Sequence, residues 1–289
     1  MGVHVPLITP FDAAGAVALD ALEALAHEVL DEGASGLVAL GTTAEPGALR
    51  VDERAAVLDV VHGVCAARKV PLTVGTEDPS TLSRYPAATA ALCLVPPFVR
   101  AGEDGVLAYF EALAARSPVP VLVYHVPLRT GQELSTAALR RLAAVDGITG
   151  VKYAPTVIDA DAVDLLTAPP PGWAVLAATD PLLAPMLALG AHGAILASAL
   201  VDTASYAALT AGAAPGLRGG AVFDRAEAHR LARLSTALFA EPNPTVIKGV
   251  LHAQGRIPTP SVRLPLLPAA RSRVDAALTL ADLAVVVGA

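Results

Sequence analysis

Lysine is scarce in this chain, and one of its lysines stands where it could act as a nucleophile. Of the 20 basic residues only Lys69, Lys152 and Lys248 are lysines. Lys69 ends a predicted helix and Lys248 lies early in another, so we expect structural or solvent-exposed roles for both. Lys152 instead ends an apolar β-type run, residues 148–151. A desolvated, neutral lysine amine can attack a carbonyl carbon and form a Schiff base.

The same residue types allow other roles for Lys152. A lysine at the end of a buried strand can form an ion pair, and Glu45 and Asp180 are the carboxylates best placed for one. Lysines at strand ends in barrels also bind phosphate or carboxylate groups of ligands. The spacing alone therefore leaves the choice open between catalysis, ligand binding and a buried ion pair.

Polar residues that could assist an imine follow several other β-type runs. Tyr124 ends the run before that of Lys152, and a phenol can transfer the protons that imine formation requires. Thr42 and Thr43 offer hydroxyl groups for a carboxylate, and Gly41 before them permits a close approach of the backbone. Arg129 follows Pro127 in the loop after the β-type run that ends at Tyr124. Its guanidinium can form bidentate hydrogen bonds to a second carboxylate there.

The elements that must position these residues alternate along the chain. Apolar β-type runs are separated by segments with helical periodicity, which favours a closed (β/α)8 barrel over an open doubly wound sheet. Neither a GxGxxG nor a GxxxxGK motif occurs, and this weakens a nucleotide-binding version of the open sheet. In a (β/α)8 barrel the chemistry lies at the carboxyl ends of the strands. The eight predicted strands span residues 3–9, 36–40, 71–74, 91–95, 119–124, 148–152, 174–177 and 193–197.

The last third of the chain contains helical patterns only. Residues 221–238, 245–254 and 268–287 are predicted helices, so we expect a barrel over residues 1–215 and a C-terminal helical extension over 216–289. Within the barrel, Ser135 and Asp180 are predicted to cap the N-termini of the helices that follow them.

Composition excludes several functions. The formal net charge is −7 and no basic run occurs, so nucleic-acid binding is not expected. The two cysteines and the histidines show no metal-ligand spacing, and no metal site is expected. The absence of a secretory signal pattern predicts a cytoplasmic protein. Residues 181–201 carry no charged side chain, but the proline and glycines within them predict a helix, a turn and a strand rather than a membrane span.

Ordered motifs over nearly the whole chain resemble the dihydrodipicolinate synthase/N-acetylneuraminate lyase family of pyruvate-dependent class I aldolases. Several such motifs in one order are far more specific than any of them alone. They comprise residues 7–11 (LITPF), 41–45 (GTTAE), 95–98 (VPPF), 124–131 (YHVPLRTG), 150–152 (GVK), 190–195 (GAHGAI) and 243–248 (NPTVIK).

The resemblance implies a role for each candidate residue. Lys152 would form the Schiff base with pyruvate, Tyr124 would relay protons, and Thr42 and Thr43 would extend the relay and bind the pyruvate carboxylate. Arg129 would bind the carboxylate of an aldehyde substrate, as in the synthase branch. No metal or organic cofactor would be needed. The remaining substrate-binding candidates are Gly41, the backbone around Ile195, and Thr9.

The chain also departs from the family pattern. Phe98 stands where the synthases usually carry a tyrosine that enters the neighbouring subunit's site. Ala44, Pro46, His125 and Tyr153 replace other usual residues. The segment 76–92 looks about ten residues short, near the surface that synthases use for tight pairing and lysine feedback. We therefore hypothesise that the enamine chemistry is kept while the second substrate has changed or broadened, and we do not expect feedback inhibition by lysine.

Three functions remain open at this level. The first is condensation of pyruvate with aspartate semialdehyde, as in 4-hydroxy-tetrahydrodipicolinate synthases. The second is an aldolase or dehydratase reaction on a 2-oxo-3-deoxy sugar acid or a related oxo acid. The third is a barrel that binds an oxo acid without catalysis. A homodimer or homotetramer is expected, without nucleic acid or membrane partners.

Overall fold

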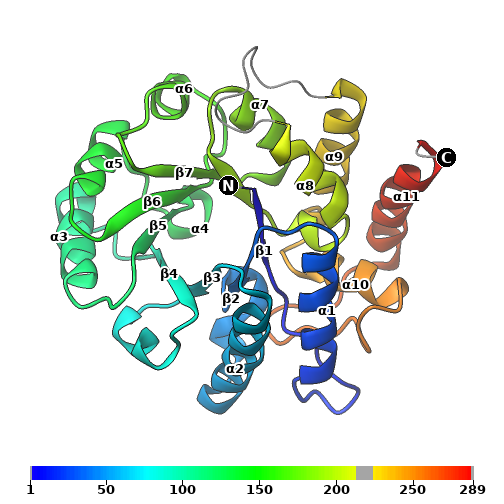
Figure 1. Ribbon diagram of the computed structural model, residues 1–289. Coiled ribbons are helices and arrows are strands. Elements are labelled where there is room, and N and C mark those ends of the chain that lie inside the picture. The colour runs from blue at the N-terminus through cyan, green and yellow to red at the C-terminus, as the bar shows by residue number, and fades with distance from the viewer. Residues whose placement is uncertain (1, 213–223, 288–289) are drawn as a thin grey trace.

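The eight predicted strands form a closed parallel barrel in the order β1 to β8. The computed structural model describes residues 2–212 and 224–287, and Figure 1 shows the barrel with helices around it. The predicted barrel is confirmed and the open doubly wound sheet is wrong. The strands are β1 Val3–Pro6, β2 Gly36–Ala39, β3 Leu72–Gly75, β4 Ala88–Leu94, β5 Val121–His125, β6 Ile148–Tyr153, β7 Ala174–Ala177 and β8 Gly193–Ile195.

Alternation along the strands sorts the side chains between two cores. In β5, Leu122 and Tyr124 point into the barrel and join a small inner cluster with Val38 and Ile195. Val121 and Val123 face the other way, into the large core between the barrel and the helices. The inner cluster thus carries a phenol among apolar side chains, as the two-residue period of a strand requires.

Helices cover the outside of the barrel, with one interruption. Residues between β3 and β4 form only a 3-10 helix, η3 Pro79–Arg84, so the short connection predicted there leaves out the usual covering α-helix. Ser135 caps α5 as predicted, since its hydroxyl accepts a hydrogen bond from the backbone N–H of Ala138. The covering helices are α1 Leu19–Asp31, α2 Val51–Arg68, α3 Gly102–Ala114, α5 Thr136–Ala143, α6 Ala160–Thr167, α7 Leu183–Ala188 and α8 Thr203–Ala211. The short helix α4 Pro127–Thr130 follows β5 at the carboxyl end of the barrel instead.

Three further helices follow the barrel, as the sequence predicted: α9 Arg225–Leu238, α10 Thr245–Ala253 and α11 Arg271–Val287. They lie together beside α8 and α1 in Figure 1. Arg230 of α9 pairs with Asp202 at the start of α8, with 2.6 Å between Nη2 and Oδ2. The boundary expected at 215/216 and the predicted helix start at 221 fall outside the described residues, so the division into two domains stays a prediction.

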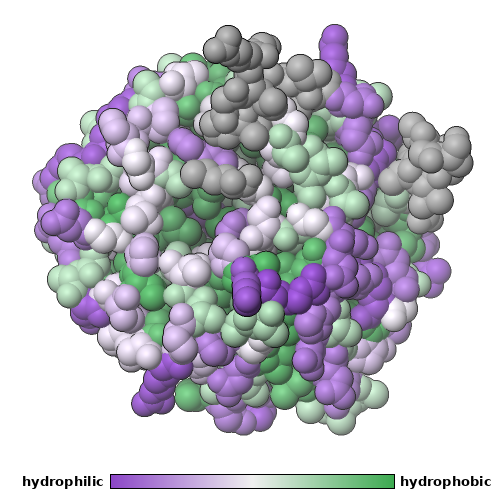
Figure 2. Space-filling model, viewed as in Figure 1, coloured by the Kyte–Doolittle hydropathy of each residue, from purple (hydrophilic) through white to green (hydrophobic). Residues whose placement is uncertain are grey.

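Residues 181–201 fold as the predicted helix, turn and strand, comprising α7 and β8. In the part of the chain that the structure describes, no helix combines the length and the apolar character needed to span a membrane. Figure 2 shows hydrophilic and hydrophobic side chains interspersed on the face viewed in Figure 1.

Candidate active site

A cavity of about 290 Å³ opens at the carboxyl ends of the strands. This is the end of the barrel where the chemistry of such folds lies. Its lining includes six of the eight residues predicted to form the site, namely Thr42, Thr43, Tyr124, Arg129, Lys152 and Ile195. Gly41 and Thr9 do not line it.

Lys152 and Tyr124 are neighbours inside the barrel. They are register partners on β6 and β5, and Lys152 Nζ lies 4.0 Å from the centre of the Tyr124 ring. Lys152 is only 6% exposed. Among the side chains described, those of residues 2–212 and 224–281, no carboxylate lies within ion-pair distance of its amine.

The ion pairs considered for Lys152 are not formed, because both carboxylates have other partners. Glu45 accepts hydrogen bonds from Lys248 Nζ and from the backbone N–H of Arg263. Asp180 Oδ1 accepts from the backbone N–H of Ser198 at 2.7 Å. The amine of Lys152 is therefore left facing the cavity.

The phenol of Tyr124 lies in an unusual electrostatic setting. Burial opposes its ionisation, but the Lys152 ammonium, a hydrogen bond from Thr42 and the Arg129 guanidinium together hold the pKa of Tyr124 below its ordinary value. A phenol of lowered pKa is a better proton donor, and its phenolate form is more accessible. The arrangement can therefore move protons next to the amine.

The turn after β2 presents the two threonine hydroxyls. Thr42–Ala44 form a 3-10 helix, η1, and Thr43 accepts a hydrogen bond from Asn243 Nδ2 at 3.0 Å. Thr9 is fully buried and donates its hydroxyl to the carbonyl oxygen of Ala44 at 2.8 Å. Thr9 was predicted to contact substrate, but its hydroxyl is already used to brace this turn.

Neither the backbone conformation nor the space around position 41 requires a glycine there. Its backbone is extended, with φ −66°, and an added Cβ would make ordinary contacts with the side chains of Val38 at 3.5 Å and Pro6 at 3.9 Å. The close approach lies instead at Gly75, where a Cβ would come within 2.4 Å of the carbonyl oxygen of Leu40. Gly75 thus lets the start of the turn after β2 lie across the end of β3.

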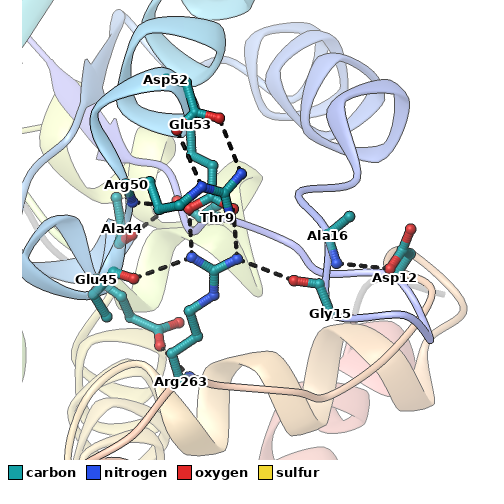
Figure 3. Close-up of polar contacts among 11 residues, drawn as sticks. Thr9, Asp12, Gly15, Ala16, Ala44, Glu45, Arg50, Asp52, Glu53 and Arg263 are labelled. Carbon is teal, nitrogen blue, oxygen red and sulfur yellow. Dashed lines mark hydrogen bonds and ion pairs between the residues drawn. The ribbon is translucent and has the colours of Figure 1, made fainter.

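Glu45 anchors the far side of the turn. The backbone N–H of Arg263 donates to Glu45, and the side chain of Arg263 extends further. Figure 3 shows its guanidinium between the segment containing Gly15 and the carboxylate of Glu53, with 2.7 Å between Nη2 and Oε1.

Lys248, expected to be structural or exposed, is fully buried against Glu45. The Lys248 amine also lies 4.1 Å from the centre of the Phe11 ring, which provides a favourable cation–π contact.

Arg129 stands at the mouth of the cavity on α4. It is exposed, and in the described residues no carboxylate pairs with it. Its guanidinium is therefore available for the carboxylate of a ligand. Leu128 beside it is also exposed and lines the mouth.

Two residues that depart from the family pattern lie away from this cavity. His125 faces the opposite side of β5 from Tyr124, where its Nε2 accepts from Leu134 N–H and its ring stacks on Tyr153. Burial lowers the pKa of His125 to about 4. Phe98 is 95% exposed with φ +70°, and it does not line the cavity. Neither side chain contributes a proton-transferring group to this site.

Four polar side chains of the cavity were not predicted as site residues: Thr156, Thr179, Asp180 and Asn243. Asp180 was predicted as a helix cap, which is wrong: Thr179 precedes the 3-10 helix and Asp180 is its first residue. Burial raises the pKa of Asp180, although the N–H of Ser198 opposes this. Asn243 comes from the C-terminal extension and is the only asparagine in the chain. Its rarity was a signal as clear as that of lysine.

Among the side chains that the structure describes, in residues 2–212 and 224–281, no group of three or more His, Cys, Asp or Glu is placed to hold a metal ion. The polar groups that line the cavity include an amine, a phenol, hydroxyls, a guanidinium and a carboxylate. A buried strand-end lysine beside a phenol in a closed (β/α)8 barrel defines the class I, Schiff-base-forming lyases and synthases.

Comparison with known proteins identifies the family within this class. Residues 1–281 match the model of the dihydrodipicolinate synthetase family, and the chain belongs to this family of pyruvate-condensing enzymes. It is 32% identical to the 4-hydroxy-tetrahydrodipicolinate synthase of Neisseria gonorrhoeae, over 96% of this chain and 97% of that one. It is 34% identical to the synthase of the same name from an Azoarcus species, over 96% of both chains.

Solved structures give the same result. The chloride-inhibited dihydrodipicolinate synthase of Acinetobacter baumannii, complexed with pyruvate, superposes with a TM-score of 0.86 at 29% identity, covering 97% of this chain and 98% of that one. The 4-hydroxy-tetrahydrodipicolinate synthase of Methylacidiphilum fumariolicum gives 0.87 at 25% identity, over 96% and 94%.

Proposed function

We propose that this chain condenses pyruvate with an aldehyde through a Schiff base on Lys152, and that the aldehyde is aspartate semialdehyde. The observation that carries the proposal is the Lys152 amine, which lies 4.0 Å from the Tyr124 ring centre and has no carboxylate partner in the described chain. An amine with no counter-ion in a buried cavity is suited to nucleophilic attack. The relatives named as 4-hydroxy-tetrahydrodipicolinate synthases support the choice of substrates.

The residues divide the reaction between them. The Lys152 amine attacks the keto carbon of pyruvate, and Tyr124 donates a proton to the resulting hydroxyl, which leaves as water. Loss of a methyl proton then gives an enamine, whose carbon bonds to the aldehyde carbon while the aldehyde oxygen gains a proton. The free amino group from aspartate semialdehyde then attacks the imine carbon and closes a ring, and the C–N bond to Lys152 breaks as the lysine nitrogen takes up a proton. Thr42 and Thr43 bind the pyruvate carboxylate, and Arg129 binds the carboxylate of the aldehyde.

Phe98 favours a second candidate with the same first steps. It carries no hydroxyl, it is 95% exposed, and it does not line the cavity. An enzyme without that hydroxyl could act instead on a 2-oxo-3-deoxy sugar acid in an aldolase or dehydratase reaction. In this candidate the 2-oxo group of the sugar acid itself forms the imine on Lys152, and cleavage of its C3–C4 bond or loss of a hydroxyl as water follows.

We further propose a homodimer or homotetramer. Phe98 and Val99 are exposed by 95% and 73% on the loop after β4, and apolar side chains of this size are commonly covered by a partner subunit. Sedimentation velocity of the purified protein tests this, and a monomer at micromolar concentration would refute it.

Borohydride reduction in the presence of pyruvate tests the proposed chemistry. We expect mass spectrometry to find a reduced pyruvyl adduct on the peptide that carries Lys152, and none in Lys152→Ala. A screen of aspartate semialdehyde against sugar-derived oxo acids then separates the two candidates. If no adduct forms and Lys152→Arg retains the affinity for oxo acids, the barrel only binds them and the proposal is wrong.

A further inference from the structure

Asn243 reaches the cavity from outside the barrel's own strands and loops. It lies just before α10, is 7% exposed, and lines the cavity. Its Nδ2 donates to Thr43 Oγ1 at 3.0 Å, across a separation of 200 residues in the chain. Lys248, five residues later, is bonded to Glu45, two residues after Thr43. The start of α10 therefore holds the same turn at two points.

The hydrogen bond from Asn243 determines how Thr43 can bind a ligand. A threonine hydroxyl has one proton to donate and two positions at which it can accept. Since Asn243 occupies an accepting position, the Thr43 proton is left for another partner. In the described chain no protein group accepts it. The hydroxyl, which is 3% exposed and lines the cavity, thus keeps its proton for a ligand there.

The orientation of the amide has a physical reason. Asn243 Oδ1 is buried and has no hydrogen-bond partner. Reversing the amide would place its NH2 group in that unpartnered position instead. Buried N–H groups without partners are rarer in proteins than buried C=O groups that lack one. The orientation with Nδ2 toward Thr43 is therefore the less costly of the two.

We propose that Asn243 is a positioning residue that fixes Thr43 as a hydrogen-bond donor to the carboxylate of the bound oxo acid. A carboxylate has only accepting atoms, so a hydroxyl whose proton pointed at residue 243 would present its lone pairs and repel it. Asn243 prevents that arrangement. This inference rests on the proposed function, because it assumes an oxo acid at Lys152.

Two substitutions at position 243 test the inference. Asn243→Ala removes the donor, and Asn243→Asp keeps the shape but places an acceptor against Thr43. The readout is the pyruvate concentration that half-saturates borohydride trapping, beside kcat at saturating pyruvate. We expect the half-saturating pyruvate concentration to rise roughly tenfold in Asn243→Ala and by a larger factor in Asn243→Asp. In both variants kcat should change less than threefold.

The pH dependence separates hydrogen-bond polarity from simple charge repulsion. In the Asn243→Asp variant, the protonated carboxyl group carries an O–H that can donate to Thr43, whereas the methyl group of Asn243→Ala cannot donate. Relative to wild type at the same pH, we expect Asn243→Asp to bind pyruvate better than Asn243→Ala near pH 4.5 and worse at pH 8. If Asn243→Asp only reaches the level of Asn243→Ala at low pH, its defect is charge repulsion and the inference is wrong.

A double-mutant cycle shows whether Asn243 acts through Thr43. In a Thr43→Val background we expect Asn243→Ala to change half-saturation by less than twofold. Thr9→Val is the matched control, because it removes a hydroxyl that braces the same turn without facing the cavity. If Asn243→Ala lowers Tm and kcat as Thr9→Val does and leaves half-saturation unchanged, its role is only structural. If wild-type protein forms no adduct at any pyruvate concentration, the proposed function fails first.

Discussion

Lys248 and Glu45 form a fully buried ion pair that ties helix α10 to the turn carrying the two threonines. Lys248 has no exposed surface, and it also donates to the carbonyl oxygen of Ser261 at 2.9 Å. The pair thus links the C-terminal extension to the mouth of the barrel. Removal of either charge would leave the other buried without its counter-ion, held only by one neutral backbone group.

Lys248→Met is therefore expected to destabilise the protein by about 3–5 kcal/mol, because it strands the Glu45 carboxylate in the interior. Denaturant unfolding monitored by circular dichroism measures this. Lys69→Met is the control, since Lys69 is exposed and a surface change should stay within about 0.5 kcal/mol. An equal, small effect of both substitutions would show that the buried pair does not anchor α10.

Tyr124→Phe is expected to lower kcat by about 10²- to 10⁴-fold, the usual contribution of a positioned proton donor. The sign of the pH effect follows from the lowered pKa of Tyr124. As pH rises through this pKa the phenol loses the proton it must donate, so the wild-type rate should decline at a pH below the ordinary tyrosine value. Rate profiles between pH 6 and 10 test this, and an unchanged alkaline limb in Tyr124→Phe would rule out the assigned role.

Arg129→Ala is expected to raise KM for a carboxylate-bearing aldehyde by roughly tenfold or more, because hydrogen bonds to a charged group are lost. Trapping with pyruvate alone should be unchanged, since Arg129 stands at the mouth of the cavity. Arg140→Ala, which changes an arginine on α5 paired with Asp164, provides the matched control. If pyruvate trapping weakens as much as aldehyde binding, the guanidinium serves the first substrate instead.

The buried carboxylate of Glu53 is expected to make the stability of the folded protein depend on pH in the acid range. The Arg263 guanidinium holds the pKa of Glu53 at about 2, against the opposing effect of burial. The folded state thus keeps this carboxylate ionised where the unfolded chain would take up a proton, so its contribution is complete above about pH 4.5 and is lost as pH falls toward 2. We expect Tm of wild type to fall more steeply over this range than Tm of Glu53→Gln. Parallel curves would contradict the assignment.

Phe98→Tyr restores the hydroxyl that the synthases usually carry at this position. If its absence is what altered the second substrate, the rate with pyruvate and aspartate semialdehyde should increase several-fold, with pyruvate trapping unchanged. Steady-state kinetics on both proteins measures this. No gain would mean that the hydroxyl is not the missing element.

Local patterns determined the elements of this fold. Each of the eight strands was predicted within a few residues, because apolar runs of this length between helical repeats leave few other arrangements. Ser135 as a cap followed from the side-chain chemistry of its position. The role of Asp180 could not be predicted in this way. Its carboxylate accepts a hydrogen bond from the backbone N–H of Ser198, in the segment after β8, and no local pattern encodes that contact.

The sequence also singled out Lys152 and Tyr124, because strand ends in a barrel converge and both residues end strands. Only the tertiary structure decided which polar side chains of the site already have a hydrogen-bond or ion-pair partner and which are left to face the cavity. Glu45 could have paired with Lys152, but Lys248 takes it from 203 residues away, and Thr9 is used to brace the turn. Asn243 joined the site only because α10 folds back over that turn. Long-range packing distributes charges and hydrogen bonds among competing partners, and the sequence order of those partners does not reveal the outcome.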